Sequence, residues 1–486
     1  MASTAEAYNP LLAHLKTPSP SPSPKQPPFP ITPQLTPKAK IFLQILKKIQ
    51  PLHLNSELTN TQINPVPELV QEVLKHSYDS PSAAIQFFKW ACLIHKQDEY
   101  CWTLMVDLLG KNEMFDVMWD AIRSMKEDGF LSVDTFVLVF GSYCVAGRAG
   151  EAIMSFDVME RYGVQTNQFA VNALLSAICR EDNQTTKAFE FFERIKTKIS
   201  PDADSFTILL EGWEKEGNTA KAKSTFGEMA IRIGWSPQNT PAYDAFLNTL
   251  VCGSEVDDAV KFLQLMKGKN CFPSLKFFSN ALDVLDKKHD AARAISLWDL
   301  MQSSRLIPNL PMYNSMIGLF CKNNAIDDAF HLLDEMVFLG AFPDSSTYNM
   351  IFKCLVKNKK VHETGKFFVE MTKNEFPPTS LNCAAAISML FDNDDPETPV
   401  EIWDFMVNNL VLPLQDSANA LLVGLCNLNR LTDFNRFAED MLDRRIEIYE
   451  STMEKLKSAC HKREGRKSTR DVYDSLEKKW KSSKNI

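Results

Sequence analysis

The sequence predicts an all-α protein, an α-solenoid of about 10–12 helix–turn–helix repeats of 35 residues. Three observations predict this fold. A proline recurs at steps of 35 or 36 residues, a methionine recurs in the same register, and apolar residues at helical spacing fill the intervals. Gly is scarce, at 17 of 486 residues, which disfavours a turn-rich all-β fold.

Two columns of residues set the register of the repeats. The prolines are Pro201, Pro237, Pro273, Pro308, Pro343, Pro378 and Pro413, and the methionines are Met159, Met229, Met266, Met301, Met336, Met371, Met406 and Met441. Methionines at helical spacing are typical of a packed core rather than of a cofactor site. Both columns therefore predict structure, and we assign them no chemistry.

Residues 310–344 illustrate how one unit is expected to fold. Apolar side chains follow helical spacing in the first half, the segment 322–325 interrupts the pattern, and a second amphipathic stretch runs to Met336. Gly340 is placed to end the second helix, and Pro343 prevents its continuation. One such helix pair cannot bury its apolar stripe alone, so neighbouring pairs must cover it.

The register divides the chain into segments. Residues 41–97 are expected to hold N-terminal helices and a degenerate first repeat, and residues 450–486 a C-terminal capping repeat with a basic tail. Residues 98–449 hold ten repeats, with predicted bounds 98–132, 133–167, 168–202, 203–238, 240–274, 275–309, 310–344, 345–379, 380–414 and 415–449.

Residues 1–40 differ from the rest in composition. Ten of the 26 prolines lie in the first 37 residues, Ser and Thr are frequent, and Glu6 is the one acidic residue. Such a segment is expected to be disordered, either as an organellar targeting peptide with a linker or as an ordinary tail. Because the first Arg of the chain is Arg123, the composition favours a chloroplast over a mitochondrial type of targeting peptide.

The overall charge does not by itself point to nucleic acid. The chain carries 53 basic and 61 acidic residues, a net charge of −8, so an RNA-binding surface would have to be locally basic. The 11 cysteines include no C-x-x-C pair, which indicates reduced thiols rather than disulfides or a zinc site. No apolar run reaches 18 residues, so no membrane span is expected.

Two strings, YNSMIGLFCK at 313–322 and DSSTYN at 344–349, resemble the repeat of the pentatricopeptide repeat family. The Pro-Asp pairs that close the units at 201–202 and 343–344 belong to the same pattern. The resemblance covers about residues 63–484, and the even 35-residue step resembles the P subclass of plant organellar members. It implies a right-handed superhelical solenoid that binds single-stranded RNA.

The sequence offers no catalytic constellation. It lacks the H-x-E with a downstream P-C-x-x-C of zinc deaminases, and it contains no P-loop and no nucleophile elbow. Its eight His are scattered without a pattern of metal ligands. We therefore expect no enzyme activity, no catalytic residues, no metal and no cofactor.

The resemblance also implies which side chains would contact bases. In such repeats the fifth and last residues of a unit contact one base, and amide, hydroxyl and carboxylate groups can tell base edges apart. Carried over unit by unit, the pairs are Asn172 with Asp202 for uridine, Thr207 with Gln238 for a purine, Ser279 with Asn309 for adenine, Asn314 with Asp344 for uridine, and Asn349 with Thr379 for a pyrimidine. Asp244 with Ser274 fits no rule, so the implied RNA core is U, purine, any base, A, U, pyrimidine.

A column of cations ends the first helix of several units. Its members are Arg180, Lys215, Lys287, Lys322 and Lys357. The resemblance implies that they contact RNA phosphates, because aligned cations act on a phosphate backbone more strongly than a diffuse net charge. The alternative is that they are helix C-terminal cations favoured by the helix dipole.

Two functions are compatible with this sequence. The first is sequence-specific binding of organellar RNA that acts by occupancy in transcript stabilisation, end processing or translation. The second is a structural scaffold, for example on an organellar ribosome, which the acidic balance favours. The mostly polar second residues of the units favour it too, because family members place an aliphatic residue there. Family members go more often to mitochondria than to chloroplasts, so we expect a mitochondrial protein, a monomer without membrane insertion, with ribosomal or RNA-processing partners.

Overall fold

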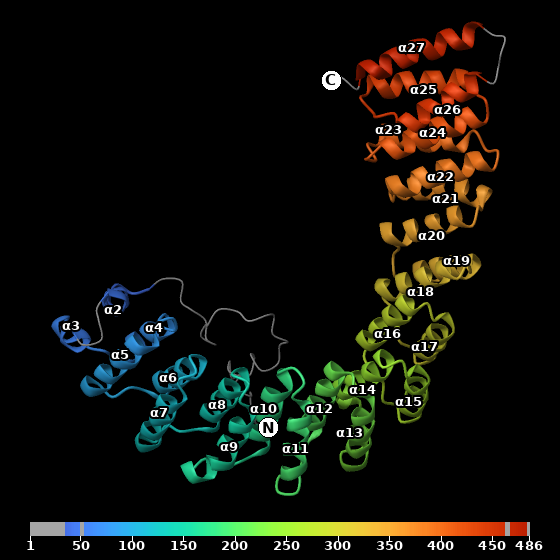
Figure 1. The fold of residues 1–486 in the computed structure, drawn as a ribbon. Coiled ribbons are helices and arrows are strands. Elements are labelled where there is room, and N and C mark those ends of the chain that lie inside the picture. The colour runs from blue at the N-terminus through green and yellow to red at the C-terminus, as the bar shows by residue number, and fades with distance from the viewer. Residues whose placement is uncertain (1–34, 49–52, 462–466, 484–486) are drawn as a thin grey trace. The chain divides into compact units, whose positions relative to one another are not determined.

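The computed structural model describes residues 35–48, 53–461 and 467–483, and the predicted targeting peptide lies outside them except for its last residues. Every regular element in the described residues is a helix, which confirms the predicted all-α solenoid (Figure 1). The chain divides into two compact units, Met1–Ser274 and Leu275–Ile486.

The helices of the first unit follow one another in pairs. They are α2 (Pro37–Lys48), α3 (Leu54–Asn60), α4 (Pro67–Lys75), α5 (Pro81–Ile94), α6 (Glu99–Lys111), α7 (Phe115–Asp128), α8 (Val133–Val145), α9 (Ala149–Val158), α10 (Gln168–Arg180), α11 (Thr185–Ile195), α12 (Ala203–Glu216), α13 (Thr219–Arg232), α14 (Thr240–Cys252) and α15 (Val256–Gly268). Two short 3-10 turns, η2 (Met159–Tyr162) and η3 (Pro237–Asn239), interrupt this order.

The helices of the second unit continue the same alternation. They are α16 (Leu275–Lys288), α17 (Ala291–Ser303), α18 (Leu310–Lys322), α19 (Ile326–Phe338), α20 (Ser345–Lys357), α21 (Val361–Lys373), α22 (Ser380–Asp392), α23 (Thr398–Asn408), α24 (Gln415–Asn427), α25 (Leu431–Asp443), α26 (Glu450–His461) and α27 (Lys467–Ser483). Each predicted repeat between 98 and 449 therefore contains two α-helices.

The helices of each repeat pack in a fixed pattern within their unit. The first helix of a repeat contacts the second helix of the same repeat and the first helices of the adjacent repeats, as α8 contacts α9, α6 and α10. In the second unit α18 contacts α19, α16 and α20 in the same way. The apolar stripe that one pair cannot bury is thus covered by its neighbours.

Local signals set the ends of these helices. Between α18 and α19 the chain turns through Asn324, which has a φ of +60°, so the predicted interruption at 322–325 is confirmed. After α19 the predicted stop also holds, because Gly340 has a φ of +80°, a conformation that costs glycine little. The boundary near residue 40 differs: α2 begins at Pro37, inside the segment predicted to be disordered, because proline is tolerated in the first helical turn.

The methionine column lies in the core, as predicted. All eight of these side chains are at most 1% exposed. Complete burial of such a side chain contributes roughly 1.5–3 kcal/mol relative to exposure. Large aromatic side chains fill the remaining space, and Phe226 of α13 stacks on Phe246 of α14 with ring centroids 4.1 Å apart.

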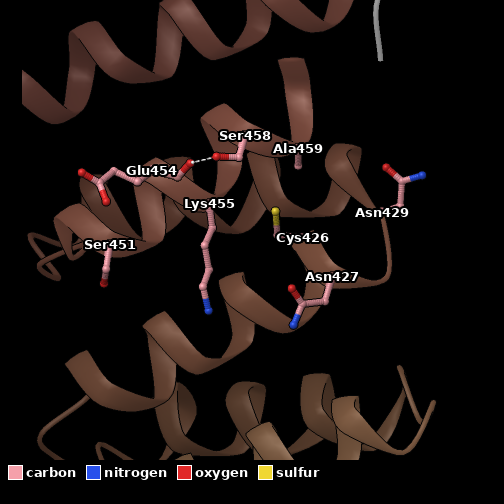
Figure 2. A pocket seen from close by; sticks show the side chains of 8 residues that line it. All are labelled: Cys426, Asn427, Asn429, Ser451, Glu454, Lys455, Ser458 and Ala459. Carbon is pink, nitrogen blue, oxygen red and sulfur yellow. Dashed lines mark hydrogen bonds between the residues drawn. The ribbon is translucent and has the colours of Figure 1, made fainter. Parts of the chain in front are cut away.

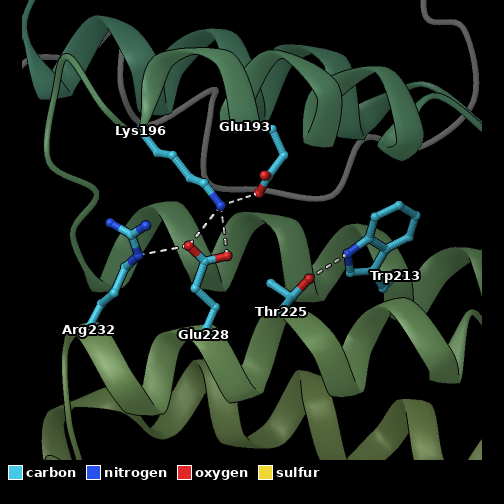
Figure 3. Close-up of polar contacts among 6 residues, drawn as sticks. All are labelled: Glu193, Lys196, Trp213, Thr225, Glu228 and Arg232. Carbon is cyan, nitrogen blue, oxygen red and sulfur yellow. Dashed lines mark hydrogen bonds and ion pairs between the residues drawn. The ribbon is translucent and has the colours of Figure 1, made fainter.

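Polar contacts join consecutive second helices at the surface. Lys196, which follows α11, lies 2.5 Å from Glu193 and 2.9 Å from Glu228 of α13 (Figure 3). Arg232 lies 2.7 Å from the same Glu228. Ion pairs near a protein surface each contribute about 0–1 kcal/mol, so these contacts add little to the stability that the apolar core provides.

Candidate nucleic-acid interface

The last residue of a repeat begins the first helix of the next repeat. Asp202, Asn309, Asp344 and Thr379 are the N-caps of α12, α18, α20 and α22, and each side chain accepts a hydrogen bond from the backbone N–H three residues later. Their backbone is extended, as N-caps require. A predicted base-contacting position is therefore also a helix-capping position.

Two of the predicted pairs meet through their side chains. The Asn172 amide nitrogen lies 3.1 and 3.2 Å from the two carboxylate oxygens of Asp202. The Asn314 amide nitrogen lies 3.4 Å from Asp344 Oδ1. In both cases the packing of α10 on α12, or of α18 on α20, brings together residues 30 positions apart.

Another predicted pair meets through the backbone. The N–H of Thr379 donates to Asn349 Oδ1 over 2.8 Å. The same bond joins Ser274 to Asp244 over 2.7 Å and Tyr449 to Asn419 over 2.8 Å, in two repeats for which no base was predicted. In these five repeats the fifth and last residues are thus neighbours, and such repeats occur in each of the two compact units.

Two predicted pairs are not joined. Gln238 is exposed within η3, and the Thr207 hydroxyl donates to the carbonyl of Ala203 in its own helix. The N-cap of α14 is Asn239, a buried residue that the predicted unit bounds left out. The extra residue of this repeat is absorbed by η3, which displaces Gln238 from the capping position. Among the described residues, no hydrogen bond joins Ser279 to Asn309.

The third residue of the following repeat completes the site. This residue was not predicted from the sequence. The Ser205 hydroxyl lies 2.7 Å from Asn172 Oδ1, and the Thr347 hydroxyl lies 2.6 Å from Asn314 Oδ1. The sequence pattern Asp-x-x-Ser/Thr could have predicted Ser205 and Thr347, because it is typical of a capping box. In a capping box the side chain of each residue accepts a hydrogen bond from the backbone N–H of the other. The structure contains this capping box at Asp202 and at Asp344.

The predicted phosphate contacts of the first unit lie among acidic groups. Arg180 is half-buried, burial lowers the pKa of its guanidinium, and its Nη2 has no partner among the described residues. Lys215 donates to the carbonyl of Cys179 over 3.2 Å. Lys215, Glu181 and Glu216 line a cavity of about 250 Å³, whose charges oppose an anion.

The predicted phosphate contacts of the second unit differ from one another. Lys287 pairs with Asp283 over 2.6 Å, and Lys322 pairs with Asp286 over 2.7 Å. Lys357 is exposed and forms no ion pair with a described residue. A phosphate would therefore compete with a carboxylate at Lys287 and Lys322, and meet no such competitor at Lys357.

An open pocket lies between α24 and α26. It has a volume of about 700 Å³ and is lined by Cys426, Asn427, Asn429, Ser451, Glu454, Lys455, Ser458 and Ala459 (Figure 2). One carboxylate and one ammonium balance each other, so the pocket offers hydrogen-bonding groups without a net charge. In the described residues no group of side chains could hold a metal ion, and no helix is long and apolar enough to cross a bilayer.

Segments of the chain match known protein families. Residues 102–229 match the model of a pentatricopeptide repeat-containing protein, and residues 308–357 and 346–376 match PPR repeat models. A mitochondrial pentatricopeptide repeat-containing protein of Arabidopsis thaliana is 34% identical over 180 residues, which are 36% of this chain and 34% of that protein. A second from the same plant is 27% identical over 252 residues, 50% of this chain and 43% of the relative. The matches thus span less than half of these relatives.

Solved structures resemble the chain at low sequence identity. The maize protein PPR10 in complex with an 18-nt psaJ RNA element is 19% identical, with a TM-score of 0.42 over 82% of this chain and 59% of that one. Yeast Rmd9p in complex with a 16-nt target RNA is 11% identical, with a TM-score of 0.35 over 92% of this chain and 96% of the other.

Stacked helix pairs with a constant period define the chain as a helical-repeat protein. The 35-residue period and the matched segments then name the family. The chain is a pentatricopeptide repeat protein.

Proposed function

We propose that this protein binds single-stranded organellar RNA in a sequence-specific way and acts by occupancy, without catalysing a reaction. Bound to a transcript, it would block exonucleases, define an end or change access for translation. None of these actions needs a catalytic group, because each follows from the presence of the protein on the RNA.

One observation carries the proposal. The polar side chains at the fifth and last places of the repeats 168–202 and 310–344 lie within hydrogen-bonding distance of each other, at equivalent places in the two units. A donor amide beside an acceptor carboxylate is the kind of group that distinguishes base edges. Of the predicted cations, Lys357 is the best placed to contact a phosphate, because no carboxylate of the described residues forms an ion pair with it.

The site of action is proposed from the relatives. The two described above carry mitochondrial names, which supports a mitochondrial rather than a chloroplast location. The composition of residues 1–40 is compatible with a targeting peptide of either type. A monomer is the simplest state for a solenoid with terminal caps.

The direct test is selection of the full chain against a random single-stranded RNA pool at near-physiological salt. We expect enrichment of U-purine-x-A-U-pyrimidine, and its loss in the double variant Asn172→Ala/Asn314→Ala. If the pool shows no enrichment and binding is only a salt-sensitive background, the proposal is wrong.

A second candidate function is a scaffold for another protein. In the second unit, Ile307, Phe342 and Leu412 occupy the same place, two residues before the end of their repeats, and are 64%, 74% and 67% exposed. Exposed apolar side chains in a regular row are typical of a protein-binding surface. A scaffold should tolerate Ala at Asn172 and Asn314, whereas the RNA binder should not.

A further inference from the structure

The asparagines at the fifth place of the repeats, Asn172, Asn314, Asn349 and Asn419, occur in two hydrogen-bonding arrangements. In one, the amide nitrogen faces the carboxylate of the last residue, as in Asn172 and Asn314. In the other, the amide oxygen accepts the backbone N–H of the last residue, as in Asn349 and Asn419. Both orientations are forced by chemistry, because a carboxylate can only accept and an N–H can only donate.

The second arrangement uses every hydrogen-bonding position of the amide. Asn349 Nδ2 donates to the carbonyls of Ser345 and Pro377, over 2.9 and 3.4 Å. Its Oδ1 accepts from the N–H of Thr379 and, over 2.9 Å, from the amide of Asn382. An asparagine side chain has two donors and two acceptor positions, so none is left for a base.

Asn419 is occupied in the same way. Its Nδ2 donates to the carbonyls of Gln415 and Glu447, over 2.8 and 3.0 Å. Its Oδ1 accepts from the N–H of Tyr449 and from the hydroxyl of Thr452, each over 2.8 Å. The residue is 5% exposed, so a base could reach it only if these bonds broke.

The first arrangement leaves capacity for a ligand. Asn172 directs one N–H at the two oxygens of Asp202, and its oxygen accepts from Ser205 and Gln168, so its second N–H has no protein acceptor among the described residues. Asn314 likewise retains one N–H and one acceptor position beside its bonds to Asp344 and Thr347. These two amides can each donate to a base without breaking an existing bond.

The capping box decides between the two arrangements. Where it is present, the third-residue hydroxyl lies near the backbone N–H of the last residue, at 3.4 Å for Ser205 and Asp202 and 3.2 Å for Thr347 and Asp344. That N–H is then occupied, and the fifth residue turns to the carboxylate. Without the box, as at Thr379, the N–H is captured by the fifth residue.

We propose that base discrimination by amides in this chain is confined to repeats closed by an Asp–Ser/Thr capping box. Asn172 and Asn314 then contact bases, Asn349 and Asn419 are structural links between repeats, and Ser205 and Thr347 are positioning residues. This inference rests on the proposed function. It removes the pyrimidine preference assigned above to the sixth base, and it makes the third residue a determinant of specificity.

The test measures the affinity of the full chain for RNAs that carry the core U-purine-x-A-U-pyrimidine, with each base in turn at the first, fifth and sixth places. We expect about tenfold preference for U at the first and fifth places and none at the sixth. The variant Thr379→Asp/Asn382→Thr installs a capping box and should create about tenfold preference for U at the sixth place alone. Asn349→Ala should lower the melting temperature without changing base preference.

Matched variants separate positioning from folding. Thr347→Ala should abolish the preference at the fifth place only, while Thr347→Ser, which keeps the hydroxyl, should retain it. A wild-type protein with no preference at any place contradicts the proposed function itself. A wild-type preference at the sixth place that Asn349→Ala abolishes overturns this inference and leaves the proposed function standing. Preference at the fifth place that survives Thr347→Ala in a folded protein overturns the positioning role.

Discussion

Single side chains in this protein take their roles from the partners that packing brings to them. Burial acts to raise the pKa of the Asp344 carboxyl, but hydrogen bonds from the Thr347 N–H and hydroxyl and from Asn314 outweigh burial and hold this pKa below its ordinary value. The group is therefore an ionised, acceptor-only carboxylate at neutral pH. Its charge fixes the direction of the Asn314 amide, which can face it only with nitrogen.

Asp344 should make the stability of the protein depend on acid pH. Because its folded pKa is depressed, its contribution is present above the unfolded pKa of about 3.9 and is lost as pH falls through the folded value. Asp344→Asn should thus lower the urea midpoint at pH 6, and the difference from the wild type should shrink as pH falls below about 4. Urea titrations at several pH values measure it; a difference that stays constant down to acid unfolding would contradict the assignment.

The contacts between helices depend on how closely neighbouring helices approach. A Cβ on Gly212 of α12 would lie 2.6 Å from Thr185 Cγ2 at the start of α11. Thr185 is 1% exposed and β-branched, so it has little freedom to move aside. Gly141 of α8, by contrast, has no such neighbour within 4 Å. Glycine is therefore required at one helical position and replaceable at the other.

Alanine substitutions at these two glycines should have opposite signs. Gly212→Ala should destabilise the protein by about 1–3 kcal/mol through overpacking. Gly141→Ala should stabilise it by roughly 0.5–1 kcal/mol, because alanine loses less backbone entropy in a helix. Chemical unfolding followed by circular dichroism measures both. Equal effects of the two substitutions would mean that α11 and α12 are not in the contact described.

Over the whole molecule, the net charge of −8 opposes a polyanion, so the proposed RNA binding requires local cations that are not already neutralised. Lys357 meets this condition, because it forms no ion pair with a described residue. Lys287 and Lys322 must release Asp283 and Asp286 first. Contact of Lys287 or Lys322 with phosphate therefore costs an ion pair that contact of Lys357 does not.

Salt dependence should separate these lysines. Each phosphate contact with a single strand contributes about −0.7 to the slope of log K against log salt. Lys357→Ala should reduce the magnitude of the slope by about this amount, and Lys287→Ala by clearly less. Filter binding of the core RNA over a range of salt concentrations is the measurement. A larger change of slope for Lys287→Ala than for Lys357→Ala would show that the Lys287–Asp283 ion pair does not survive in the complex with RNA.

Much of the fold could be predicted from the sequence because its determinants are local and repeated. The proline and methionine columns, the turn at Asn324 and the stop at Gly340 depend on the conformational limits of single residues. The period was therefore visible without a structure. The pairing of Lys287 with Asp283 was not predicted, although the two residues lie one helical turn apart in the sequence.

The sequence by itself determined the repeat and its family, and it predicted the positions of the side chains that we propose contact bases. Only the tertiary structure decided which of those side chains are still available. The bonds that occupy Asn349 come in part from residues 28 to 33 positions away, and Lys322 is neutralised by a carboxylate 36 positions away. Such bonds exist only once repeats stack, because stacking rather than chain connectivity sets the distance between their side chains.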